Sequence, residues 1–448
     1  MRGSGVRLAA LFVLGAYLLA ACTGSVAPPA TPPQNRPTLP GQGAALTPGP
    51  VVQANSDIAR DFLRLVYFRE SGLELPGLLR FEAPVRVALS GRGLSAYAAD
   101  LDALIARMRR EAGIDIARVG RVSEANILIA VAPRARLREV FPGAQCFVSP
   151  RKLSWQRFRA ALGAGTLPGW DALEALTEAA IYIPDDASPQ DVRDCLEEEL
   201  AQTLGPANDL FELSQSVFND DNVHNRLTRF DMLVLRLLYD PALKSGMGRA
   251  EAARTVRRLL ASANPAGQRV APRPGLRPSS EWDAILRGLF RSNAPRPAQR
   301  ASLRRGLRLA QSFPQPDHRL ATTLDLLAAL EFGARPELSE GLLERALTSL
   351  ERWGAPQDLR QATIRVYLAA TKQALGKSAE VLPLIETALP VLAAHDAAAR
   401  IDQALSLRTQ ALQSLGRSED AAQSAIDSRA WSAYVRGTPA GRLLRFSP

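Results

Sequence analysis

The chain has 448 residues, a length typical of two or three domains, and a formal net charge of +10. The positive charge is concentrated in residues 249–308, where fourteen arginines stand against three acidic residues. This excess favours anionic lipid head groups, lipopolysaccharide or an acidic protein as partner, or else an arginine-rich linker that is simply solvated. After residue 21 no stretch is apolar enough to span a bilayer, which excludes a chain that crosses the membrane repeatedly.

The first residues have the pattern of an export signal. Two arginines precede an apolar run over residues 8–21, which is too short for a transmembrane helix of about 20 residues. The run closes with Leu19-Ala20-Ala21-Cys22, which resembles the lipobox of bacterial lipoproteins. That resemblance implies removal of residues 1–21 as a lipoprotein signal peptide and acylation of Cys22. An ordinary signal peptide with an incidental cysteine is the alternative.

These features predict a periplasmic protein that is attached to the membrane through its lipid anchor and does not meet nucleic acid. Thr23 follows the acylated cysteine, so the aspartate of an inner-membrane retention signal is missing. Its absence favours the outer membrane. Residues 22–54 are rich in Pro, Gly, Ala, Thr and Gln and cannot bury a core, which predicts a disordered tether.

Two cysteines remain after the lipid-anchored one. Cys146 begins a short strand-like Cys-Phe-Val, and Cys195 lies early in a predicted helix. In an oxidising compartment two leftover cysteines more often pair than stay free. We therefore predict a disulfide between Cys146 and Cys195, with two buried thiols as the alternative.

Residues 55–265 mix helical and strand patterns, which predicts an α+β domain with a mixed sheet. A cluster of good N-cap residues opens a first helix, and a second amphipathic helix is predicted over residues 94–112. Runs of β-branched and apolar residues predict strands over 85–89, 126–131, 146–148 and 180–183.

The helix after the last of these strands carries the candidate site. Ser188-Pro189 begins it, because serine is a good N-cap and proline fits the first helical turn. Its end reads Glu-Glu-Leu-Ala-Gln-Thr-Leu-Gly-Pro-Ala-Asn-Asp over residues 198–209. This segment resembles the active-site helix of metzincin zinc proteases, H-E-x-x-H-x-x-G-x-x-H, without its histidines. On that frame the three ligand positions hold Glu198, Gln202 and Asn208, the general-base position holds Glu199, and the helix-ending glycine is Gly205.

The segment that follows resembles the matrixin branch of the metzincins. Residues 227–239 predict a helix that starts Leu-Thr-x-x-Asp and ends Leu-Tyr, and Phe218 stands where the Met-turn would place methionine. Short blocks also resemble a family known only as a domain of unknown function in exported alphaproteobacterial proteins. That resemblance covers residues 55–265 and implies a degenerate zincin-like fold with no known substrate. It rests on Asp194-Cys195-Leu196, Glu198-Glu199-Leu200-Ala201-Gln202, Val217-Phe218-Asn219-Asp220-Asp221 and Phe230-Asp231-Met232-Leu233.

The residues at the ligand positions argue against a metal. Zinc prefers nitrogen and sulfur ligands with an occasional carboxylate, and here one carboxylate would stand with two neutral amides. Members of the resembled family usually carry His where this chain has Glu197, which weakens an inherited metal role further. We therefore expect no cofactor, and without a metal Glu199 has no activated water to deprotonate. A calcium site with oxygen ligands alone remains an alternative. It would be formed by Glu198, Gln202, Asn208 and Asp209 or by the turn at 219–222, and a solvated loop is the other alternative.

The C-terminal half predicts helices alone. Residues 266–279 contain three prolines and predict a linker, and residues 280–448 predict eight consecutive helices. Leu375-Gly376-Lys377-Ser378 recurs as Leu415-Gly416-Arg417-Ser418, an offset of 40 residues. This pattern resembles tetratricopeptide-type helical hairpins, although their usual offset is 34 residues. An all-α helical-repeat domain is the prediction, and an irregular helical bundle is the alternative.

These expectations lead to three hypotheses for function. The first is an envelope protein that binds or scaffolds a protein or peptide partner through its helical repeats and carries an inactive metallopeptidase-like domain. The second is an active peptidase or amidase that uses Glu199 with an atypical metal site. The third makes the repeats the whole functional unit and the α+β domain a rigid spacer.

Overall fold

The computed structural model describes residues 51–69, 71–141, 144–211, 213–219, 223–272, 280–291, 294–313, 317–353 and 358–436. The predicted signal peptide, Cys22 and the tether as far as residue 50 lie outside the described residues. The described chain begins packed, since Val51 and Ala54 are already buried next to the first helix.

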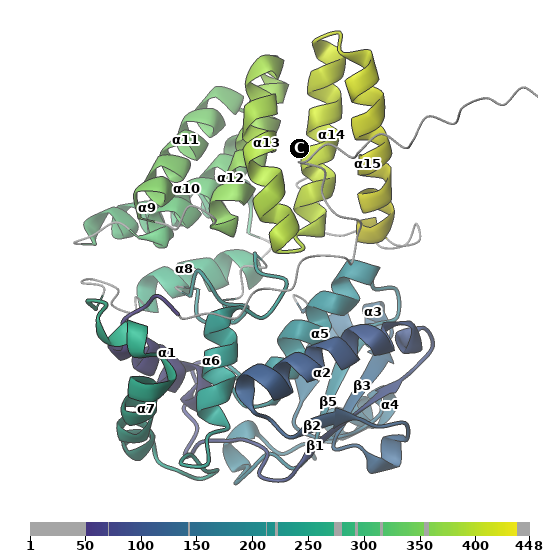
Figure 1. The fold of residues 1–448 in the computed structure, drawn as a ribbon, viewed down its shortest axis with the longest axis vertical. Coiled ribbons are helices and arrows are strands. Elements are labelled where there is room, and N and C mark those ends of the chain that lie inside the picture. Colours follow the sequence, from purple (N-terminus) through teal and green to yellow (C-terminus); the bar gives the residue numbers. More distant parts are fainter. Residues whose placement is uncertain are drawn as a thin grey trace, which may run out of the picture. The chain divides into compact units, whose positions relative to one another are not determined.

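A mixed five-stranded sheet forms the centre of the α+β part, in the order β2-β1-β3-β5-β4 (Figure 1). Strands β1, β2, β3 and β5 run parallel, and β4 pairs antiparallel with β5 at the edge. The strands are β1 (Val85–Ser90), β2 (Ile116–Arg118), β3 (Ile127–Ala132), β4 (Phe147–Ser149) and β5 (Ala179–Pro184). The predicted strands agree with β1, β3, β4 and β5, whereas the three-residue β2 was not predicted.

Both faces of the central strands are buried. Successive side chains of a strand point to opposite faces, so each strand contributes to two cores. In β3, Ile127 and Ile129 enter one core, while Leu128 and Ala130 enter the other. The first core is covered by α2 (Ala98–Ala112). It is extended by α1 (Asn55–Tyr67), α5 (Pro189–Thr203), α6 (Arg229–Leu238) and α7 (Arg249–Ala263). The second is smaller and is covered by α3 (Arg134–Val140) and α4 (Trp155–Gly163).

The smaller core is aromatic. Phe158 of α4 lies against Tyr182 of β5 with ring centroids 5.2 Å apart, and Trp155 meets the same ring at 5.2 Å. The Tyr182 hydroxyl donates a hydrogen bond to the Leu153 carbonyl at 2.9 Å, which satisfies its polar end. Short helices such as α3 and α4 were not predicted, since they lack a long periodic apolar pattern.

Three helices pack beside the sheet and extend the main core. These are α1 (Asn55–Tyr67), α6 (Arg229–Leu238) and α7 (Arg249–Ala263). Asn55 ties α1 to the end of α7 by donating hydrogen bonds to the Leu260 and Asn264 carbonyls, each at 3.1 Å. A short 3-10 helix, Pro265–Gln268, lies at this junction and includes the first residues of the linker predicted over 266–279.

The described residues from 280 onward form eight consecutive helices, as predicted, which confirms an all-helical C-terminal region. Neighbouring helices pack pairwise as α10 with α11, α12 with α13 and α14 with α15 (green to yellow in Figure 1). The helices are α8 (Ser280–Arg291), α9 (Arg296–Ser312), α10 (His318–Glu331), α11 (Pro336–Trp353), α12 (Leu359–Ala374), α13 (Ser378–Ala394), α14 (Ala398–Ser414) and α15 (Ser418–Arg436).

The recurring tetrapeptides occupy the same structural place. Gly376 lies between α12 and α13 with a φ of 75°, and Gly416 lies between α14 and α15 with a φ of 73°. In both turns the glycine N–H bonds three residues back, to Gln373 and Gln413, and the next N–H bonds five residues back. This is the Schellman ending of a helix, in which a left-handed residue lets the chain reverse.

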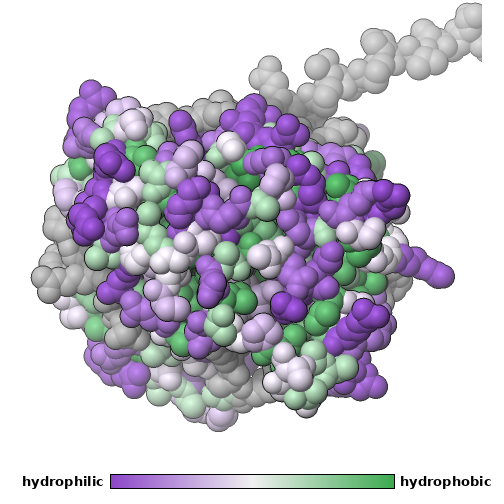
Figure 2. Space-filling model, turned by 90° about the horizontal axis from the view of Figure 1, so that it is seen from below, coloured by the Kyte–Doolittle hydropathy of each residue, from purple (hydrophilic) through white to green (hydrophobic). Residues whose placement is uncertain are grey.

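None of the helices in the described part of the chain is long and apolar enough to cross a membrane. On the face drawn in Figure 2, hydrophilic residues are interspersed with apolar ones.

Candidate functional site

The site helix α5 (Pro189–Thr203) begins where the sequence predicted. The Ser188 side chain accepts from the Asp191 N–H at 3.1 Å, and the Asp191 carboxylate accepts from the Ser188 N–H at 3.1 Å. This reciprocal capping box satisfies two N–H groups that a helix start leaves open. Pro189 follows as the first helical residue, so the start of α5 is fixed by local chemistry.

A disulfide joins Cys146, just before β4, to Cys195 in the second turn of α5, with the two Cα atoms 6.0 Å apart. The predicted pairing is therefore confirmed. The bridge links the antiparallel edge strand to the site helix across 49 residues of sequence. It limits any movement of α5 away from that edge of the sheet.

Two of the three residues that the sequence predicted at ligand positions, Gln202 and Asn208, make hydrogen bonds within the protein. The Gln202 amide donates to both carboxylate oxygens of Asp209, at 3.1 and 3.3 Å. The Asn208 amide donates to the Arg64 carbonyl of α1 at 2.9 Å, so this side chain holds the loop after α5 onto another helix. The structure thus brings Gln202 together with Asp209, the neighbour of the predicted third position.

Glu198 and Glu199 lie in the last turns of α5 and are partly buried. Glu198 shares a helix face with Gln202 because residues four apart lie one above the other. The Glu199 carbonyl accepts a hydrogen bond from the Thr203 hydroxyl at 2.6 Å, which closes the end of the helix.

The end of α5 is held tightly against the segment before β1. Gly205 has a φ of 139°, and a side-chain Cβ at this position would lie 2.6 Å from the Leu79 carbonyl oxygen. Only glycine allows the backbone so close to another backbone. The Tyr239 hydroxyl, just beyond α6, donates to the Leu204 carbonyl at 3.1 Å. The glycine that the sequence predicted to end the helix therefore also seats it.

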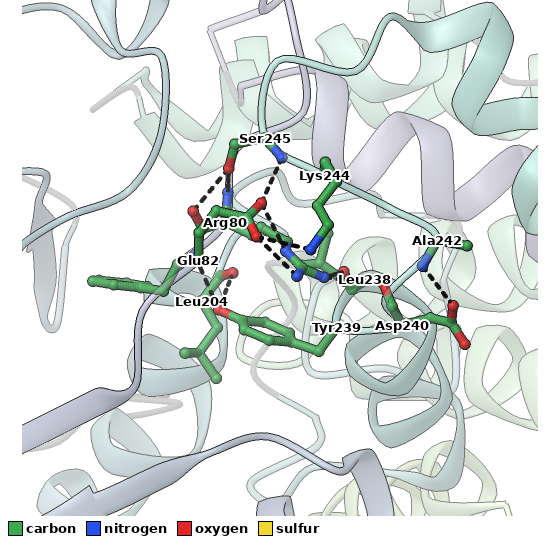
Figure 3. A network of polar contacts seen from close by, with 10 residues as sticks. Arg80, Glu82, Leu204, Leu238, Tyr239, Asp240, Ala242, Lys244 and Ser245 are labelled. Atoms are coloured by element: carbon green, nitrogen blue, oxygen red, sulfur yellow. Dashed lines mark hydrogen bonds and ion pairs between the residues drawn. The ribbon is translucent and has the colours of Figure 1, made fainter.

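Figure 3 shows the polar network around this seat. Arg80 is buried and donates to the Leu238 carbonyl at 2.8 Å and the Asp240 carbonyl at 3.1 Å, at the negative end of α6. It also pairs with both oxygens of Glu82, at 3.1 and 3.0 Å. Partial burial alone would raise the pKa of Glu82, but hydrogen bonds from Arg80 and the Ser245 N–H hold it below its usual value. The network holds the ends of α5 and α6 against the segment before β1. It was not predicted from the sequence.

A second buried network fixes the turn at residues 216–218, for which the sequence predicted a likeness to the Met-turn. The Asp231 carboxylate, fully buried, accepts from the Ser216 hydroxyl, from the Val217 N–H at 3.2 Å and from the Thr228 N–H at 2.7 Å. It also completes the capping box that starts α6. Burial raises the pKa of Asp231 although these donors favour its charged form. Phe218 follows in the turn and is fully buried.

Two charged residues of α5, Glu197 and Arg193, link this helix to neighbouring segments. Glu197 accepts from the Leu227 N–H at 2.9 Å and lies 3.8 Å from the Arg226 guanidinium. Arg193 bonds the Asp100 carboxylate of α2 at 2.8 Å and the Tyr434 hydroxyl of α15 at 2.9 Å. Arg226 therefore pairs with an acidic residue of α5, Glu197, whereas Arg193 of α5 forms its ion pair with Asp100 of α2.

The histidines gather around the loop between α5 and α6. His224 contacts the Ser214 carbonyl through Nε2 at 3.1 Å, and the His395 ring lies 5.8 Å from its ring centroid. Burial, the neighbouring His395 and Arg360 lower the pKa of His224 to about 3, so it is neutral at ordinary pH. His318 contacts the Phe211 carbonyl at 3.2 Å. His318 and His395 belong to the C-terminal helical region, and nothing in the sequence indicates that they meet this loop.

No group of three His, Cys, Asp or Glu side chains within the described ranges is placed to hold a metal ion. Asn219, from the alternative calcium turn, is buried and donates to the Leu213 carbonyl at 3.0 Å. The remaining residues of that turn, 220–222, lie outside the described residues.

Residues 55–258 match a family model described as "Protein of unknown function (DUF2927)". The match begins at the first residue of α1 and ends within α7, so it spans the α+β part and leaves out the helical region. No curated protein and no solved structure matches the chain.

Proposed function

We propose that the protein is a lipid-anchored binding or scaffold protein of the cell envelope whose α+β part keeps a metallopeptidase frame without metal chemistry. The order of elements supports the metzincin frame: a sheet, the site helix α5, the glycine seat, the turn at 216–218 and the capped helix α6 follow one another. An exported location rests on the sequence pattern before residue 22 and on the disulfide, which persists in oxidising compartments.

The proposal that the metallopeptidase frame is inactive rests on the residues at the former ligand positions, whose side chains make structural hydrogen bonds. A zinc site needs donors whose lone pairs converge on one point. The Gln202 amide instead donates to Asp209, and the Asn208 amide nitrogen is turned to the Arg64 carbonyl. These side chains stabilise the loop after α5, which is a structural use that does not require a cation.

The arrangement of the helical hairpins supports the binding half. Helix ends of this region contact the α+β part: Arg360, near the start of α12, donates to the Ser214 carbonyl at 3.1 Å, and Tyr434, near the end of α15, accepts a hydrogen bond from Arg193. The turns within the hairpins, such as those at Gly376 and Gly416, belong to the opposite ends of these helices. Helical hairpins stacked in this way offer an extended surface for a protein or peptide partner.

Measurements of metal content and of peptide hydrolysis together test the proposal that the α+β part is inactive. We expect purified full chain to carry no stoichiometric zinc after dialysis, and we expect Glu199→Gln to leave any peptidase activity of the preparation unchanged. Stoichiometric zinc, or activity that disappears with Glu199→Gln while the thermal unfolding midpoint stays the same, would instead establish the active peptidase or amidase.

Site-specific photo-crosslinking in intact cells tests the binding half. Ile426 on α15 has 50% of its side chain exposed, and Leu162 on α4 offers a control with 42% exposed on the α+β part. A photoreactive residue at 426 should give discrete crosslinked species that position 162 does not give. Identical products from the two positions would contradict binding through the repeats.

A further inference from the structure

A hollow of about 380 Å³ lies between the neighbouring helices α10 and α11. Leu320 and Leu324 of α10 give it an apolar floor, and Leu324 is buried at its base with 1% exposed. The lining residues of α11 include Gly341, Arg345 and Arg352. The hollow therefore combines an apolar floor with a basic side.

Gly341 keeps the hollow open. It lies within α11, where glycine is a poor helix former because it loses more conformational freedom on folding than other residues. Gly205 is required by the close approach of other atoms, but a Cβ at Gly341 would meet nothing within 4 Å among the described residues. Any larger side chain at position 341 would project into the hollow, so glycine leaves room for a closely approaching group.

Gly341 also belongs to a stripe along one face of α11. Residues at alternating steps of three and four share this face, namely Leu338, Gly341, Arg345, Thr348 and Arg352. The apolar end of the stripe is accessible, since 42% of Leu338 is exposed. This spacing is typical of a face along which a second helix packs, and a glycine within it allows the two backbones to approach closely.

The charges beside the hollow favour an acidic partner. Arg345 is exposed and forms no ion pair among the described residues, and Arg352 adds a second positive charge seven residues later. Glu344 also lines the hollow, but the Lys372 ammonium of α12 lies 3.2 Å from its carboxylate and offsets its charge. A partner with carboxylates opposite the arginines and an apolar side chain against the leucines of α10 would complement both features.

We propose that this hollow binds a helix of a partner protein, with small or apolar residues opposite Gly341 and acidic residues opposite Arg345. The inference deepens the proposed binding through the helical repeats and rests on it. It assigns the contact to one hairpin and gives the chemistry of the helix that fits there.

Fluorescence anisotropy with purified full chain and a labelled synthetic helix tests the hollow. The probe is an alanine-based peptide of about 20 residues, long enough to be helical, with leucine and glutamate along one face. We expect it to bind, and we expect peptides with lysine for glutamate or serine for leucine to bind at least about tenfold more weakly. A probe that does not bind, or equal binding of the three peptides, would overturn the proposal.

Gly341→Leu separates binding from folding, because the new side chain would fill the hollow. Leucine is a better helix former than glycine, so the thermal unfolding midpoint should rise by about 2 °C, while affinity for the probe should fall at least about tenfold. Gly288→Leu in α8 is the matched control, since a Cβ there also meets nothing within 4 Å but Gly288 does not line the hollow. It should raise the midpoint similarly and leave affinity unchanged. Wild-type affinity in Gly341→Leu would overturn the proposal.

Arg345→Glu tests the charge. It should remove most of the preference for the glutamate peptide over the lysine peptide, because the new carboxylate offsets the charge of Arg352. Arg429→Glu, at an exposed position on α15, changes the net charge equally and should keep the preference. An undiminished preference in Arg345→Glu would overturn the proposal. Discrete crosslinks from position 426 together with a probe that does not bind would overturn the hollow alone and leave binding through the repeats in place.

Discussion

Replacing Gly205 with alanine tests how closely α5 is seated. The residue has a φ of 139°, which L-residues rarely adopt, and this strain costs about 1–2 kcal/mol. The new Cβ would also lie 2.6 Å from the Leu79 carbonyl oxygen and 2.7 Å from a methyl of Leu238, so the backbone must shift, at about 1–3 kcal/mol. We expect a total loss of about 4 kcal/mol in the free energy of unfolding.

Gly113→Ala is the control within the same part of the chain. Gly113 ends α2 with a φ of 71°, but a Cβ there would meet nothing within 4 Å, so strain alone remains. Thermal unfolding followed by circular dichroism should show a midpoint about 12 °C lower for Gly205→Ala and about 4 °C lower for Gly113→Ala. Equal shifts for the two variants would refute the close approach of α5 to the segment before β1.

Three further perturbations address the networks around α5. Asp231→Ala removes the carboxylate that accepts from three donors and should lower the free energy of unfolding by about 3 kcal/mol. Asp358→Ala removes only a helix cap and should lower it by about 1 kcal/mol. Equal losses for the two variants would contradict the buried network around Asp231. Cys146→Ser combined with Cys195→Ser opens a link across 49 residues and should cost about 4 kcal/mol by chain entropy, and an unchanged denaturation midpoint would contradict the bridge. Tyr239→Phe loses one hydrogen bond and should cost about 1 kcal/mol in the same denaturation assay, while an unchanged free energy of unfolding would mean that its ring and not its hydroxyl holds α5.

Local patterns in the sequence were enough to predict much of the fold. Ser188-Pro189 predicted the start of α5 because capping is a matter of neighbouring residues, and the Leu-Gly-x-Ser tetrapeptides predicted two equivalent turns for the same reason. Two leftover cysteines in a chain predicted to be exported were enough to predict the bridge from Cys146 to Cys195.

Features that depend on long-range packing could not be predicted in this way. Strand β2 has three residues and is a strand only because it pairs with β1. Arg80 has an ordinary arginine pattern in the sequence, and its burial against α6 depends on residues about 160 positions away. Asp396 occupies the same place in its turn as Gly376 and Gly416 do in theirs, but only the hydrogen bonds of the three turns reveal this. Its sequence context, His-Asp-Ala, does not repeat the Leu-Gly-x-Ser pattern.

Zinc binding by a restored site tests the central claim most directly. In the triple variant Glu198→His, Gln202→His and Asn208→His, three nitrogen ligands occupy the frame, and we predict about one zinc per chain that survives dialysis. The wild type and the single variant Glu198→His should retain none. Zinc bound by the wild type would contradict the loss of metal chemistry, and a triple variant that keeps the disulfide and the wild-type circular dichroism spectrum yet retains no zinc would contradict the metallopeptidase frame.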